Sequence, residues 1–181
     1  MRIEYRTEPE YIEYLDGEAH PKVSPRISHG AVQAELAMIL RNTAPRPHLI
    51  ATEGDAAVRN DEARRTKLIP DVSFYFPNRF QGLPREQQEE PPFSPEIAIE
   101  VRSRGDKQSY LKRKIERYFA TGSELVLDVD FRKRTIVSYT ADGGIRRFEE
   151  QERFTNEPFP WFTFELRNLF SVLDAIPDWL R

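Results

Sequence analysis

The chain has 181 residues, a formal net charge of −3, and 39% hydrophobic and 31% charged residues. This composition is typical of a single folded domain, here residues 1–181, and it excludes an intrinsically disordered chain. The absence of cysteine excludes disulfides, thiolate metal sites and thiol catalysis, so a metal ion would need oxygen ligands or the three histidines.

Location and partners are constrained by the same sequence. No apolar run approaches the roughly 18 residues that a membrane span needs, and the N-terminal stretch lacks the apolar segment of a signal peptide. We therefore expect a cytoplasmic protein with no membrane partner. The weakly negative net charge argues against indiscriminate nucleic-acid binding, whereas local basic clusters remain compatible with contact to DNA.

The first part of the chain predicts a short element followed by a helix. The short element, a strand or helix, ends at the turn formed by Asp16 and Gly17, and an extended segment with prolines follows. Ser28 is placed to cap a helix over residues 28–43. Apolar residues recur there at the spacing of one helical face, at Val32, Leu36, Ile39 and Leu40. His29 shares that face, and Glu35 lies at its edge.

Two strands and a long connection come next. Residues 48–60 and 65–76 predict strands joined by a polar turn. Alternation in the second strand places Asp71 on the face opposite to Val72. Residues 77–95 are polar and rich in proline, so we expect a long, mobile loop.

The following strand and helix carry two charges in apolar surroundings. Residues 96–103 have the composition of a buried central strand, in which Glu100 alternates with Ile99 and Val101. The next helix has an apolar face formed by Leu111, Ile115, Tyr118 and Phe119, and it is expected to end at Gly122. At 100° per residue Lys114 projects onto that apolar face.

The C-terminal part completes the predicted fold. Residues 124–131 and 134–140 predict a hairpin, and a last strand and a short amphipathic helix follow. The order of elements indicates an α/β or α+β domain with a central mixed sheet flanked by helices. The aromatic segment Phe159–Phe164 could belong to the core or form a homodimer interface, since cyclic dimers are the commonest oligomers.

Asp71, Glu100 and Lys114 form the candidate catalytic set. Burying an unpaired charge costs several kcal/mol, so these residues are expected to offset one another or to surround a metal ion. Mg²⁺ or Mn²⁺ needs only one or two carboxylates in addition to water, and Asp71 and Glu100 would provide them. Lys114 would orient a nucleophilic water and stabilise developing negative charge. The alternative is a buried polar network in a protein without catalytic activity.

The order of several motifs resembles a known family. P-D-V-S-F, I-A-I-E-V-R-S and K-x-x-x-Y-x-x-x-G are followed by E-L-V-L-D-V-D. This order looks like that of the Uma-two family of endonucleases, a branch of the PD-(D/E)XK superfamily with the restriction-endonuclease-like fold. The resemblance extends from E-Y-L-D-G-E at Glu13–Glu18 to F-x-L-x-x-L-F near the C-terminus. It implies metal-dependent hydrolysis of DNA, with Asp71 and Glu100 as the motif acidic residues.

One position departs from the superfamily pattern. Arg102 stands two residues after Glu100, where the superfamily has lysine. The resemblance implies that a lysine from the neighbouring helix can replace it, and Lys114 is the best-placed candidate. Without that contact, either Arg102 would take the cationic role or the protein would be a catalytically silent nucleic-acid or protein interaction module.

The remaining polar residues have weaker patterns. Glu13 and Glu35 could each add a carboxylate to the site. We interpret His29 as a capping or core residue, and His20 and His48 as surface residues. A basic cluster next to the proposed site could contact a phosphate backbone or be a solvated helix face; it consists of Arg102, Arg104, Lys107, Lys112 and Arg113.

Overall fold

A six-stranded mixed sheet forms the centre of the computed structural model, which describes residues 11–22, 26–59, 65–103, 105 and 107–177. Its strands lie in the order β10-β9-β8-β7-β6-β3. Their bounds are β3 (Leu49–Thr52), β6 (Val72–Tyr75), β7 (Ile97–Val101), β8 (Leu125–Asp130), β9 (Thr135–Thr140) and β10 (Ile145–Phe148). The pair β7 and β8 is parallel, and the other neighbouring pairs are antiparallel. Because β7 and β8 are buried along their whole length, their near-continuous apolar runs are physically required.

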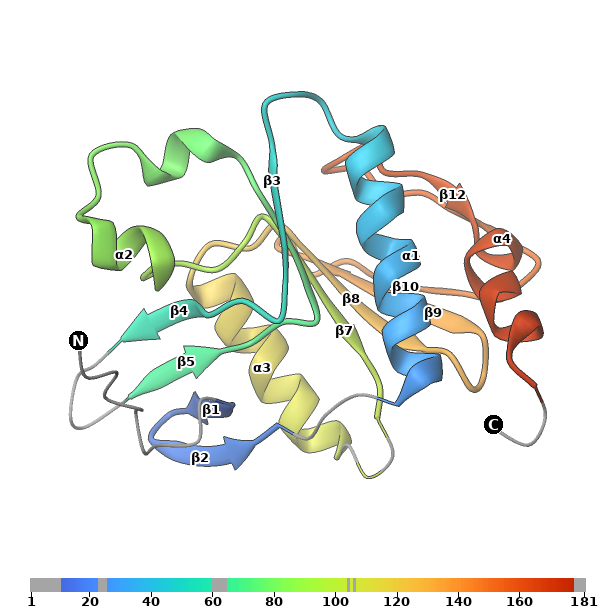
Figure 1. Cartoon of the computed structure of the whole chain (residues 1–181), viewed down its shortest axis with the longest axis horizontal. Coiled ribbons are helices and arrows are strands. Elements are labelled where there is room, and N and C mark those ends of the chain that lie inside the picture. Colours follow the sequence, from blue (N-terminus) through green and yellow to red (C-terminus); the bar gives the residue numbers. More distant parts are fainter. Residues whose placement is uncertain (1–10, 23–25, 60–64, 104, 106, 178–181) are drawn as a thin grey trace, which may run out of the picture.

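Helices cover both faces of this sheet (Figure 1). On one face, α1 (Ile27–Thr43), α4 (Leu166–Ser171) and the 3₁₀-helix η2 (Val172–Ala175) enclose the larger apolar core. On the other, α3 (Gln108–Ala120) connects β7 to β8 and packs its apolar side chains on the sheet. The predicted fold class is confirmed.

A second, smaller sheet lies beside α3 (Figure 1). Its order is β2-β1-β5-β4, with bounds β1 (Ile12–Leu15), β2 (Glu18–Pro21), β4 (Ala56–Arg59) and β5 (Thr66–Leu68). Leu15, Ala57 and Leu68 of this sheet share an apolar cluster with Leu111 and Tyr118 of α3. The N-terminal hairpin is thereby brought close to β7 and α3. A third, two-stranded sheet pairs β11 (Arg153–Phe154) with β12 (Phe164–Glu165).

Several sequence-based boundaries are wrong. The first helix begins at Ile27 after an extended Arg26, so Ser28 is not its N-cap. Each of the two predicted strands over residues 48–60 and 65–76 is broken in two. Glu53 adopts a φ of 56° at the first break, and Pro70, which cannot donate a ladder hydrogen bond, lies at the second.

The connection over residues 77–95 is also more regular than predicted. It contains the 3₁₀-helix η1 (Pro77–Phe80) and the short helix α2 (Arg85–Glu89). Phe80 and Phe93 pack edge-on, with ring centroids 5.3 Å apart, and Arg79 donates to the Ser94 carbonyl at 2.8 Å.

Among the described residues, no helix has the length and apolarity required to cross a membrane.

The C-terminal aromatic residues belong to the core. Phe154, Phe159, Phe162 and Phe164 are buried, and their rings contact one another at centroid distances of 5.0–5.4 Å for the Phe154–Phe162, Phe154–Phe164 and Phe162–Phe164 pairs. The phenylalanines of the segment Phe159–Phe164 therefore belong to the core, the first of the two alternatives, while Trp161 is only partly buried against it.

Replacing Phe162 with alanine tests this aromatic core. Phe162 is 0% exposed, so truncation removes buried apolar area and leaves a cavity. We expect Phe162→Ala to lower the free energy of unfolding by about 3–5 kcal/mol in urea titrations. Ile145→Ala is the control, since Ile145 is 70% exposed and its truncation should change stability by less than about 0.5 kcal/mol. Equal effects of the two substitutions would contradict the assignment of Phe162 to the core.

Candidate active site

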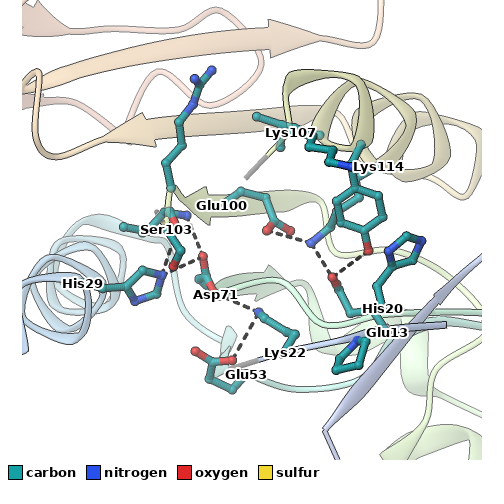
Figure 2. A pocket seen from close by; sticks show the side chains of 15 residues that line it. Glu13, His20, Lys22, His29, Glu53, Asp71, Glu100, Ser103, Lys107 and Lys114 are labelled. Carbon is teal, nitrogen blue, oxygen red and sulfur yellow. Dashed lines mark hydrogen bonds and ion pairs between the residues drawn. The ribbon is translucent and has the colours of Figure 1, made fainter. Parts of the chain in front are cut away.

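One pocket collects charged side chains from both sheets, α1 and α3 (Figure 2). Its volume of about 140 Å³ is sufficient for a hydrated cation. The charged groups converge because the N-terminal hairpin docks against the ends of β6 and β7, where the central strands leave the core. The acidic and basic side chains that line the pocket are Glu13, His20, Lys22, His29, Glu53, Asp71, Glu100, Arg102, Lys107 and Lys114.

Asp71 lies immediately before β6 and accepts hydrogen bonds on both carboxylate oxygens. Its Oδ1 is 2.9 Å from Lys22 Nζ, and its Oδ2 accepts the Val101 backbone N–H at 2.6 Å. His29 Nε2 is 3.4 Å from the same Oδ2 and 2.9 Å from the Val101 carbonyl. Burial by itself would raise the pKa of Asp71, but the His29 hydrogen bond and the charge of Lys22 outweigh it and hold that pKa well below its usual value. Asp71 is therefore ionised at neutral pH.

Glu100 is buried inside β7, with one cationic and one neutral donor. Its Oε2 is 2.7 Å from Lys114 Nζ, and its Oε1 accepts the Tyr118 hydroxyl. Burial raises the pKa of Glu100 from 4.5 to about 7, because desolvation outweighs the attraction of Lys114 and the negative charge of Asp71 adds to the rise. Two nearby carboxylates thus have strongly different proton affinities, a pattern that is frequent at functional sites.

Lys114 connects Glu100 to Glu13. Its ammonium lies 2.8 Å from Glu13 Oε1 (Figure 2). The Lys114 side chain is only 4% exposed. Glu13 also accepts the Ile69 backbone N–H at 2.7 Å and the Tyr110 hydroxyl at 3.0 Å. Desolvation opposes the charge of Lys114, but the two carboxylates raise its pKa above the usual value. Lys114 is therefore a fixed cation rather than a proton acceptor at neutral pH.

A family model described as "Uma2: Putative restriction endonuclease" matches residues 1–167. The chain belongs to the Uma2 family. A crystal structure described as a "putative nuclease" from Anabaena variabilis ATCC 29413 matches the fold with a TM-score of 0.74 and 22% sequence identity, over 90% of each chain. Among curated proteins, none matches the sequence.

In this Uma2 chain, neither Arg102, the alternative cation, nor Glu35, the possible additional carboxylate, contacts Glu100 or Asp71 in the ion pairs described above. The Arg102 guanidinium pairs with Asp128, with Nε 2.6 Å from Oδ1, so the contact to Glu100 is made by Lys114. Glu35 is half-buried and is not among the residues that line the pocket. Glu13, in contrast, belongs to the pocket through its contact with Lys114.

Several pocket residues carry no clear signal in the sequence. Lys22 and Glu53 lie in an extended segment and at a turn, where no periodicity indicates which way a side chain points. His29 was expected on a core face, and its contact with Asp71 depends on how α1 docks. His20 is not a simple surface residue, since it lines the pocket with its ring centroid 4.2 Å from that of Tyr110.

Two members of the expected basic cluster are neutralised by carboxylates of the same chain. Arg102 is paired with Asp128, and Arg113 Nη1 is 2.7 Å from Glu18. Lys107 is exposed at the pocket and Lys112 is exposed on α3, whereas Arg104 lies outside the described residues. Contact with a phosphate backbone near the pocket would thus rely on few available cations.

The pocket fits a small divalent cation in its donor chemistry. Asp71 and Glu100 offer hard oxygen atoms, the type that Mg²⁺ and Mn²⁺ prefer. Its four carboxylates, Glu13, Glu53, Asp71 and Glu100, share the lining with four Lys and Arg side chains, Lys22, Arg102, Lys107 and Lys114, so the pocket offers oxygen ligands without an excess of negative charge. Within the described ranges, no group of three or more His, Cys, Asp or Glu side chains is arranged to hold a metal ion. Water molecules would therefore have to complete the coordination.

The high pKa of Glu100 predicts a specific dependence of stability on pH. Because the folded state raises this pKa from 4.5 to about 7, the contribution of Glu100 to stability is full below pH 4.5 and is lost as the pH rises through 7. Glu100→Gln cannot titrate. In EDTA, we expect the unfolding free energy of wild type relative to Glu100→Gln to fall by roughly 2–3 kcal/mol between about pH 5 and pH 8. A constant difference across this range, measured by urea unfolding, would contradict the raised pKa.

Proposed function

We propose that this Uma2 protein is a metal-dependent endonuclease that hydrolyses DNA phosphodiester bonds with a metal-activated water. The observation that carries the proposal is that Asp71, Glu100 and Lys114 line one pocket, with the Lys114 ammonium 2.7 Å from Glu100. Membership of a family whose description is "Putative restriction endonuclease" supports a nucleic-acid substrate. The nuclease description of the Anabaena variabilis structure accords with the same activity.

Asp71 and Glu100 are the residues that would hold Mg²⁺ or Mn²⁺. When bound, such an ion activates a water molecule and neutralises charge on the phosphate. Asp71 remains ionised because His29 and Lys22 lower its pKa. Its orientation is fixed by the Val101 N–H, which donates to Oδ2 at 2.6 Å.

Lys114 would act through its charge. Glu13 and Glu100 keep its pKa above the usual value, so it cannot remove a proton from water near neutral pH. A protonated ammonium held at this position can donate hydrogen bonds to the attacking water and stabilise negative charge that develops on the phosphate. Glu13 anchors the ammonium on the side away from Glu100 and is a positioning residue in this mechanism.

A second candidate function is an interaction module without catalytic activity. The observation in its favour is that both motif carboxylates are already paired with lysines of the same chain, at 2.9 Å for Asp71 and 2.7 Å for Glu100. Such pairs satisfy the buried charges without a metal ion. In this case, Mg²⁺ and Mn²⁺ would raise the melting temperature little, since they would not bind selectively to the folded state.

Cleavage of supercoiled and branched DNA in Mg²⁺ or Mn²⁺ tests the proposed activity. We expect Glu100→Ala to reduce the cleavage rate at least about 100-fold, because the substitution removes a metal ligand and the partner of Lys114. Glu35→Ala is the matched control: it removes a carboxylate that does not line the pocket and should leave the rate within about twofold. Equal cleavage by wild type and Glu100→Ala would contradict the proposal.

A further inference from the structure

Lys22 is a second lysine whose ammonium contacts carboxylates of the pocket, and three oxygen atoms surround it. Nζ lies 2.7 Å from the Ile69 carbonyl, 2.9 Å from Asp71 Oδ1 and 3.3 Å from Glu53 Oε2. Figure 2 shows its side chain pointing to Asp71 and Glu53, apart from the contact between Lys114 and Glu100. An ammonium has three N–H donors, and each has an acceptor here, so its hydrogen-bonding capacity is satisfied in this position.

The backbone also holds Lys22 in place. It directly follows β2, and its N–H donates to the Tyr11 carbonyl at 2.9 Å. Lys67 provides a contrast, since its side chain has the same 17% exposure but its ammonium is 3.4 Å from Asp55. Lys22 is therefore a fixed positive charge beside Asp71 rather than a mobile surface side chain.

Glu53 is held toward Lys22 from the other side. Its Oε1 accepts Gln33 Nε2 at 3.1 Å, and its Oε2 accepts the Tyr11 hydroxyl. The same Gln33 nitrogen donates to the Asp71 carbonyl at 2.8 Å, which links Glu53 to the start of β6. The oxygen atoms around the ammonium thus come from parts of the chain that are fixed independently of Lys22.

Two-metal nuclease sites place two cations about 3.5–4 Å apart, stabilising the attacking and leaving oxygens. We propose that Lys22 is a positioning residue that fills the second cation position with its own ammonium, so that the site takes one divalent ion instead of two. This inference rests on the proposed function for the first ion, which Asp71 and Glu100 would hold. Asp71 would then lie between that ion and Lys22.

Counting bound Mn²⁺ by titration calorimetry on the whole chain tests the inference. We expect about one Mn²⁺ for wild type and two for Lys22→Ala, in which Asp71, Glu53 and the Ile69 carbonyl become available. Lys67→Ala is the matched control and should bind one, because it removes a lysine of equal exposure that does not line the pocket. Adding Glu53→Ala to Lys22→Ala should return the count to one.

The outcomes separate this inference from the proposed function. If wild type binds no Mn²⁺ and Lys22→Ala binds one, the result would support the claim that the Lys22 ammonium occupies a cation position. It would contradict the proposed metal-dependent activity. The same count on wild type and Lys22→Ala, with both proteins folded by circular dichroism, would overturn the role of Lys22. If Lys22→Ala does not fold, Lys22→Gln gives the same test, because glutamine removes the charge and retains a donor for the Ile69 carbonyl.

Discussion

The ion pairs of Lys114 are the interaction on which the site depends. One ammonium joins Glu13 of the small sheet to Glu100 of the central sheet, and it comes from the helix that packs against both. Burying such a set costs several kcal/mol of desolvation per charge, and apolar residues of similar volume would often stabilise a fold as well or better. The network is therefore poorly explained by stability alone. The proposed hydrolysis would need a cation at a defined distance from a carboxylate, and this network provides one.

The small sheet is part of this site rather than an addition to the nuclease fold. Its hairpin supplies Glu13, and Lys22 directly follows β2. Lys22 and Lys114 each lie between carboxylates from different elements. The two motif carboxylates, Asp71 and Glu100, differ in their proton affinity. Burial raises the pKa of Glu100 against the opposing charge of Lys114, whereas His29 and Lys22 lower the pKa of Asp71. A cation that approaches the pocket would meet one carboxylate that is always ionised and one that exchanges its proton near pH 7.

Sequence reasoning is most informative where burial imposes a pattern. The apolar runs of β7 and β8 and the phase of α3 follow from periodicity, and the same phase places Lys114 on the buried face of its helix. The position of Lys22 does not follow, because it depends on the docking of a hairpin and not on any repeat. The break at Glu53 depends on a left-handed backbone conformation that non-glycine residues seldom adopt. The partner of Arg102 depends on which strand lies next to β7, and the parallel register that brings Asp128 beside Glu100 is a property of the assembled sheet.

The central claim is that Asp71 and Glu100 bind one divalent cation together. Anomalous diffraction from crystals of the wild-type protein soaked in Mn²⁺ above pH 7 tests it most directly, since Glu100 is then mostly ionised. The account predicts one anomalous peak within bonding distance of a carboxylate oxygen from each residue, with Lys114 still in contact with Glu100. A pocket without a peak, in which both carboxylates keep only their lysine partners at saturating Mn²⁺, would contradict it.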